Sequence, residues 1–97
     1  MRPPTKLLIA ARVTLGYTQA ELAASSGLAV RTIYNTEHGF GDLESVEHLV
    51  DHFQKNGIEF VKPEAGQGWG IFNRNIVESF DDERKRNRLA RRARKND

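Results

Sequence analysis

The sequence contains no cysteine, which excludes disulfide bonds, thiolate nucleophiles and zinc sites with cysteine ligands. It also contains no apolar run near the roughly 20 residues that a membrane-spanning helix needs. Residues 1–5 carry a positive charge, but the hydrophobic stretch of a secretory signal does not follow them. We therefore expect a cytoplasmic protein that makes no contact with a membrane.

The sequence also lacks the motifs of common enzymes, including GxSxG, the P-loop, DxD and HExxH. Residues 66–70 are rich in glycine, but they are expected in a hairpin turn rather than before a helix, where phosphates bind. Glu44, His48 and His52 have the helical spacing of metal ligands, yet both histidines fall opposite the apolar residues and are expected to face water. We therefore expect no enzyme, no catalytic residue, no cofactor and no metal site.

The charges of the 97-residue chain, which sum to +2, are unevenly distributed. Residues 1–73 hold six Lys or Arg against eight Asp or Glu, whereas residues 74–97 hold nine against five. Between residues 84 and 95, eight of twelve residues are basic and none is acidic. A weakly acidic body with a basic end indicates a polyanionic partner.

Capping residues and apolar spacing predict a mostly α-helical fold. Leu, Ile, Val and Phe together supply 24 residues, which is enough for one small hydrophobic core. Four helices are expected, at residues 6–15, 18–25, 30–37 and 43–56. Apolar and polar residues then alternate over residues 58–62, and a return strand at 69–73 completes a short β-hairpin.

The C-terminal residues 75–97 are expected to form a basic tail. Acidic residues come first in it and basic residues follow, an order that suits the dipole of a helix. Asp81 and Lys85, like Asp82 and Arg86, have the spacing of ion pairs on a helix surface. The tail is therefore either a helix or an arm that is disordered until it meets its partner, and a purely solvated tail is the alternative to both.

The residues around the second and third expected helices carry a specific resemblance. They are Leu15-Gly16-Tyr17-Thr18-Gln19-Ala20-Glu21-Leu22-Ala23, Gly27-Leu28, Ile33 and Glu37-His38-Gly39. In these positions the chain resembles the lambda-repressor/Cro-like helix-turn-helix family, often called the XRE family, over about residues 6–54. The resemblance implies a four- to five-helix DNA-binding domain of the kind found in bacterial and phage regulators.

This resemblance gives the expected organisation of the chain. Residues 1–57 form the helix-turn-helix DNA-binding domain, and residues 58–74 form a β-hairpin extension that serves as a dimerisation element. Residues 75–97 form the basic C-terminal helix or disordered tail.

The resemblance also implies which residues contact DNA. The third helix would enter the major groove and bring four residues to base edges: Val30, Arg31, Tyr34 and Asn35. An arginine can pair with both acceptors of guanine, and an asparagine can do the same for adenine. Phosphate contacts would come from the family positions Gln19, Thr32 and His38, and from Arg91 and Arg92 of the tail. The alternative is a polar helix face that meets only solvent.

Two further expectations concern structure rather than DNA contact. Arg12 and Glu37 resemble the partly buried ion pair that joins the first and third helices in the family. The hairpin residues Phe60, Ile71 and Phe72 present more apolar area than a small body covers, which favours a homodimer. The alternative is a hairpin that folds back only on its own helices.

The function that follows is a sequence-specific transcriptional regulator. We expect a dimeric repressor whose partner is double-stranded DNA carrying an inverted-repeat operator. The second hypothesis is an antitoxin, which neutralises a protein toxin through its tail or hairpin and uses DNA binding to regulate its own promoter.

Overall fold

The computed structural model describes residues 1–95 of the chain. Its elements are α1 (Thr5–Thr14), α2 (Gln19–Ser26), α3 (Val30–Glu37), α4 (Leu43–Lys55), β1 (Ile58–Val61), β2 (Gly70–Asn73) and α5 (Phe80–Lys95). The described chain is thus mostly helical, with five helices and a two-stranded antiparallel sheet. This confirms the expected mostly α fold with one hairpin. None of these helices is long and apolar enough to cross a membrane.

Local sequence explains where α2 begins and ends. The Oγ1 atom of Thr18 accepts a hydrogen bond from the amide of Glu21 at 3.1 Å, and Glu21 Oε1 accepts one from the amide of Thr18 at 3.0 Å. These reciprocal bonds satisfy two donors that a helix start leaves without partners. The helix ends at Gly27, whose φ of 78° is readily accessible only to a residue without a Cβ.

One hydrophobic core joins the first four helices to the hairpin. Its buried residues are Leu8, Ala11, Leu22, Ala23, Ile33, Leu49, Val50, Phe53, Ile58 and Phe60. The rings of Phe53 and Phe60 meet edge to face, with centroids 6.2 Å apart. Because Ile58 and Phe60 come from β1, the hairpin completes the core rather than standing outside it.

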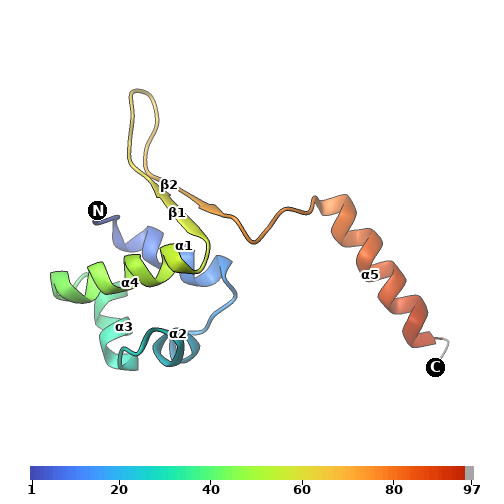
Figure 1. The fold of residues 1–97 in the computed structure, drawn as a ribbon, viewed down its shortest axis with the longest axis horizontal. Coiled ribbons are helices and arrows are strands. Elements are labelled where there is room, and N and C mark those ends of the chain that lie inside the picture. The colour runs from blue at the N-terminus through green and yellow to red at the C-terminus, as the bar shows by residue number, and fades with distance from the viewer. Residues whose placement is uncertain (96–97) are drawn as a thin grey trace.

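The register of the hairpin determines which side chains face the core. Ile58 pairs with Asn73 and Phe60 with Ile71 on the inner face, while Phe72 lies opposite Glu59 on the outer face. Nδ2 of Asn73 also donates to the carbonyl oxygen of Thr14 at 3.0 Å, at the end of α1. The strands are therefore attached to α1 and α4, and the loop that joins them extends away from the helices (Figure 1).

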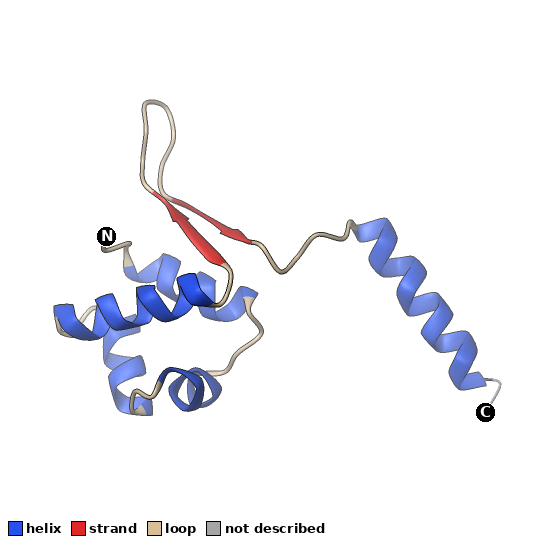
Figure 2. Cartoon of the chain, in the orientation of Figure 1, coloured by secondary structure: helices blue, strands red, loops and turns tan. Residues whose placement is uncertain are grey.

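Helix α5 stands apart from the other elements, at the end of the connecting residues 74–79 (Figure 2). Every residue from 80 to 94 is exposed. The amide of Asp82 donates to Ser79 Oγ at 3.1 Å, and the Asp82 carboxylate accepts from the amide of Ser79 at 3.0 Å. Residues 80–95 thus form a helix that begins with a capping box, as in the first of the two alternatives for the tail.

The ion pairs expected on α5 do not form. Arg86 pairs with Glu78, which precedes the helix, because the Asp82 carboxylate is engaged at the helix cap. The structure also records no ion pair between Asp81 and Lys85. The spacing of four residues is present on the helix, but capping at Asp82 and the nearby Glu78 give Asp82 and Arg86 other partners.

Candidate nucleic-acid interface

Arg12 of α1 and Glu37 of α3 form a two-pronged ion pair. Nε of Arg12 donates to Oε2 of Glu37 at 2.7 Å, and Nη2 donates to Oε1 at 3.2 Å. The Glu37 side chain is only 3% exposed and that of Arg12 16%. Nη1 of Arg12 also donates to the carbonyl oxygen of Tyr17 at 2.9 Å. The guanidinium therefore joins α1, α3 and the loop that leads into α2.

Gln19, a residue expected at a phosphate, belongs to the same cluster. Its Nε2 atom donates to Oε1 of Glu37 at 3.0 Å, which fixes the side chain against α3. A primary amide carries two hydrogens, so one N–H and the carbonyl oxygen of Gln19 remain for another partner. At the start of α2, the amide of Glu21 is bonded to Thr18 Oγ1, whereas the amides of Gln19 and Ala20 have no partner within the helix. Gln19 thus stands half-buried where donors converge at the start of a helix.

The two sides of α3 differ in burial. Ile33, Thr36 and Glu37 are buried, and the hydroxyl of Thr36 donates to the carbonyl oxygen of Thr32 at 2.7 Å. The residues expected at base edges lie on the other side: Val30, Arg31 and Tyr34 are exposed, and Asn35 is partly buried. Of the residues expected at phosphates, His38 is exposed and Thr32 is partly buried. The helix therefore presents a polar face that no other described element covers completely.

Tyr34 and His38 make a contact that the sequence analysis did not foresee. Their rings stack, with centroids 3.9 Å apart and planes 25° from parallel. Nδ1 of His38 lies 2.8 Å from the carbonyl oxygen of Tyr34, and since a carbonyl only accepts, Nδ1 carries the hydrogen. The spacing of four residues between two rings was the available signal. The stack orients both rings on the exposed side of α3.

The loop after α3 is closely packed against that helix. The amide of Phe40 donates to the carbonyl oxygen of Asn35 at 2.8 Å. A Cβ on Gly41 would lie 2.5 Å from Oγ1 of Thr36, so only glycine fits there without a shift. The Phe40 side chain itself is 82% exposed. The loop thus holds a large apolar residue in solvent beside the polar face of α3.

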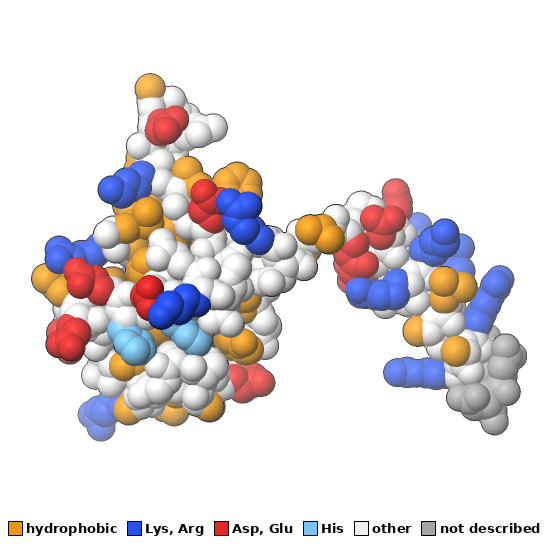
Figure 3. All heavy atoms as spheres, in the orientation of Figure 1, with side chains coloured by type: hydrophobic (Ala, Val, Ile, Leu, Met, Phe, Trp, Pro, Cys, Tyr) orange, Lys and Arg blue, Asp and Glu red, His pale blue; other side chains and the backbone are white. Residues whose placement is uncertain are grey.

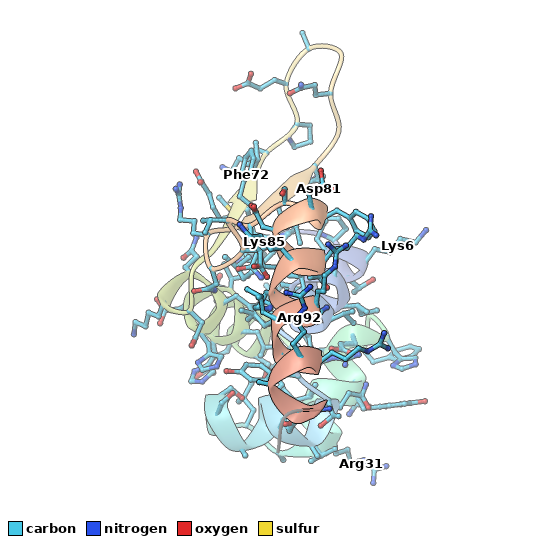
Figure 4. All side chains as sticks on the ribbon, turned by 90° about the vertical axis from the view of Figure 1, so that its right-hand side faces the viewer. Lys6, Arg31, Phe72, Asp81, Lys85 and Arg92 are labelled. Carbon is cyan, nitrogen blue, oxygen red and sulfur yellow. The ribbon has the colours of Figure 1, made fainter. Side chains whose placement is uncertain are left out.

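Positive charge is scarce on this side of the body. Arg31 is the only Lys or Arg between residues 13 and 54. Figure 4 shows it at the edge of the helical body, extended away from the ribbon. Residues 13–54 can therefore offer hydrogen bonds and helix dipoles at α2 and α3, but only one Lys or Arg side chain.

The tail residues expected at phosphates are Arg91 and Arg92 of α5, and both are exposed. Successive residues of a helix are about 100° apart, so these two arginines point in clearly different directions. Figure 3 shows acidic side chains near the start of α5 and Lys and Arg side chains further along it. The two arginines therefore do not act as one contact point.

The histidines of α4 correct an expectation. They contact α2 rather than only water: His48 Nε2 donates to the carbonyl oxygen of Ser26 at 2.7 Å, and His52 Nε2 lies 3.1 Å from Ser25 Oγ. Burial against α2 lowers the pKa of His52, and the neighbouring His48 lowers this pKa further. Within residues 1–95, no group of three or more His, Cys, Asp or Glu is arranged to hold a metal ion. These histidines link two helices.

The expected dimerisation residues lie in different surroundings. Phe60 is 4% exposed and belongs to the core of its own chain, so it cannot meet a second copy in this conformation. Ile71 is partly buried against the same core. Phe72 is 60% exposed on the outer face of the hairpin. Alternation along a strand does not tell which of its faces is buried, so the sequence pattern did not separate the buried Phe60 from the exposed Phe72.

No family model matches the chain. No curated protein is similar enough in sequence to count as a relative. The function must therefore follow from the arrangement of α2, α3 and their surroundings.

Proposed function

We propose that the chain is a sequence-specific DNA-binding regulator of the lambda-repressor-like helix-turn-helix type, with α3 as its recognition helix. One observation carries the proposal. The buried Glu37 carboxylate fixes the inner side of α3 to Arg12 and Gln19, while the opposite side presents Arg31 and Asn35. A reading helix needs this combination, because base contacts require side chains held in a fixed position and free of other partners.

The exposed side chains suit the edges of base pairs. Arg31 can donate two hydrogen bonds to O6 and N7 of guanine, and Asn35 can bond N6 and N7 of adenine. Val30, at the start of the helix, can contact the methyl group of thymine. Gln19, with the free amides at the start of α2, suits a phosphate. Thr32 and His38 flank the reading residues and supply further phosphate contacts in the proposal.

The proposed regulator is a homodimer and acts as a repressor in the cytoplasm. Phe72 is exposed on a hairpin whose strands pair only with each other within residues 1–95. Pairing of two hairpins across a two-fold axis would cover Phe72 and extend the sheet. Such a dimer reads two half-sites about one DNA turn apart, and an occupied inverted repeat blocks a promoter.

Selection of binding sites from a randomised duplex pool tests the proposal. We expect enrichment of an inverted repeat with half-site centres roughly 34–36 Å apart. Arg31→Ala should then weaken operator binding by about 1–3 kcal/mol and relax the preference at one base pair. Arg2→Ala is the matched control. It removes an exposed arginine that precedes α1 and pairs with Glu47.

Two results would contradict the proposal. One is a pool that yields no enriched sequence although the chain binds DNA in a salt-sensitive way. The other is an equal effect of Arg31→Ala on the operator and on random duplexes, which would remove α3 from base reading.

An antitoxin is the second candidate, favoured by the position of α5 outside the body. In an antitoxin, deletion of residues 79–97 would abolish neutralisation of the toxin and leave operator binding and its salt dependence unchanged. If these residues are instead a DNA-binding arm, the same deletion would weaken binding to every duplex. Full-length and shortened chains compared in both assays separate the two candidates.

A further inference from the structure

We infer that α5 is a second DNA-binding element, which holds the phosphate backbone through one face of the helix. Four arginines form this face, which we call the arginine face: Arg84, Arg88, Arg91 and Arg94. The inference rests on the proposed function, because it assigns to α5 the charge that the reading helix lacks. It reads no sequence and adds affinity for duplex DNA of any sequence.

Helix geometry brings these arginines together. Arg84, Arg88 and Arg91 follow the spacing i, i+4, i+7, which places them on one side of a helix. Together with Asn87 they line one shallow hollow on α5, and Arg94 joins Asn87 and Arg91 at the next hollow along the helix. The face therefore continues over several turns. Lys85 and Arg92, which are labelled on α5 in Figure 4, line neither hollow.

The charges of the arginine face are not neutralised by the chain. Among residues 74–94, the ion pairs are those of Arg74 with Glu59 and of Arg86 with Glu78, and neither involves the face. The acidic residues of α5 lie in its first turn, where Asp82 caps the helix start. The second half of α5 thus presents cations without nearby acids.

The distribution of apolar residues on α5 argues against a groove in a partner protein. An amphipathic helix that docks in such a groove places its large apolar residues on one side. Phe80 and Leu89 are nine residues apart, which puts them on opposite sides of the helix at about 100° per residue. The guanidinium of Arg84 also lies over the Phe80 ring, 6.0 Å from its centroid. A polyanion fits α5 better than an apolar cleft does.

DNA is the polyanion that the rest of the chain requires. Affinity for DNA comes largely from release of the counterions that Lys and Arg displace from phosphates. Residues 1–73 have more acidic than basic residues, and the side that bears α3 offers Arg31 alone between residues 13 and 54. The connecting residues 74–79 span at most about 20 Å, so α5 stays tethered close to the body that bears α3.

The salt dependence of DNA binding by the full chain tests this inference. One variant combines Arg84→Gln, Arg88→Gln and Arg91→Gln. The matched variant combines Lys85→Gln, Arg86→Gln and Arg92→Gln, which removes the same charge from residues that line neither hollow. Circular dichroism shows whether both variants keep their helices. Binding is measured on the selected operator and on a duplex of random sequence over a range of salt concentrations.

We expect the arginine-face variant to lower the slope of log K against log salt concentration by about 2.7, which corresponds to three lost phosphate contacts. The loss should be the same on both duplexes, and the matched variant should change the slope by less than half as much. Equal changes in both variants would overturn the inference, because only net charge would then matter. Unchanged slopes in both would also overturn it and would favour a protein partner for α5.

The outcomes for α5 and α3 are separable. If the pool yields an enriched operator but the arginine-face variant binds DNA with an unchanged salt dependence, the inference is refuted and the proposed function stands. Salt-sensitive binding that depends on the arginine face, without any enriched sequence, would refute the proposed function and keep α5 as a DNA-binding element.

Discussion

Nε of Arg12 lies 2.7 Å from Oε2 of Glu37, and the two residues come from helices that are separated along the chain by α2. Glu37 ends α3, and its second oxygen accepts hydrogen bonds from both Arg12 and Gln19. The buried Glu37 carboxylate thus joins α3 to both α1 and α2, in addition to the packing of the hydrophobic core. Any change in this cluster should alter the position of the exposed side of α3 as well as stability.

Arg12→Met should destabilise the fold strongly, because it leaves the buried Glu37 carboxylate without its cation. Loss of one partner from a buried pair costs about 3–5 kcal/mol. Arg2→Met is the control, since the pair of Arg2 with Glu47 is more than half exposed on both sides and such pairs contribute about 0–1 kcal/mol. Urea unfolding measures both free energies. Similar losses in the two variants would show that the Glu37 charge is not held by Arg12.

Gly41→Ala should destabilise the chain through steric overlap. The added Cβ would lie 2.5 Å from Thr36 Oγ1 and 2.8 Å from Thr36 Cα, so the loop or α3 must shift. Overpacking of this kind costs about 1–3 kcal/mol. Gly68→Ala in the hairpin loop is the matched control, because nothing lies within 4 Å of its added Cβ. Thermal unfolding of both variants tests the difference, and a neutral Gly41→Ala would refute the close packing of this loop.

The stability of the fold should decrease in mildly acidic solution, in part through His52. Burial lowers the pKa of His52 from its ordinary value of 6.5, so the unfolded chain binds this proton more readily than the folded chain. Stability is therefore full above the unfolded pKa and decreases as the pH falls through 6.5 toward the lowered folded pKa. His52→Gln should flatten this decrease in urea unfolding measured across the same pH range. An unchanged pH profile in the variant would exclude His52 as a source.

Phe60 and Phe72 should respond differently to truncation. Phe60→Ala removes a core ring and should cost about 3–5 kcal/mol of unfolding free energy. Phe72→Ala removes an exposed ring, so it should leave the unfolding of the isolated chain nearly unchanged and weaken self-association. Sedimentation at several protein concentrations measures the second effect. A chain that remains monomeric at every concentration, with or without Phe72, would exclude the hairpin dimer.

Rules for neighbouring residues predicted the elements that are stabilised by contacts between neighbouring residues. Thr18 and Glu21 stand at the spacing of a capping box, and the structure forms both of its bonds at the start of α2. The same rule applied to Ser79 and Asp82 would have decided between a helix and a disordered arm for the tail. Charge order and ion-pair spacing do not distinguish a helix from a disordered arm, whereas the spacing of Ser79 and Asp82 favours a helix start.

The remaining differences depend on packing between distant segments. A helical wheel places His48 opposite the core of its own helix, but it does not show that the end of α2 covers that side. Alternation likewise identifies two faces of β1 without telling which one α4 and α1 bury, and Phe60 lies on the buried one. The pair of Arg12 and Glu37 was expected from the family resemblance rather than from spacing. Contacts between residues that lie far apart along the chain have no signature in a single sequence.

The exposure of every residue from 80 to 94 has a consequence for how the chain can change over generations. A substitution in the core alters both folding and whatever the body binds, since the same residues support both. A substitution in α5 disturbs no packed neighbour, so its cost to folding is confined to the helix itself. Whatever α5 binds, the strength of that contact can therefore vary, one arginine at a time, without any accompanying change in the packed body.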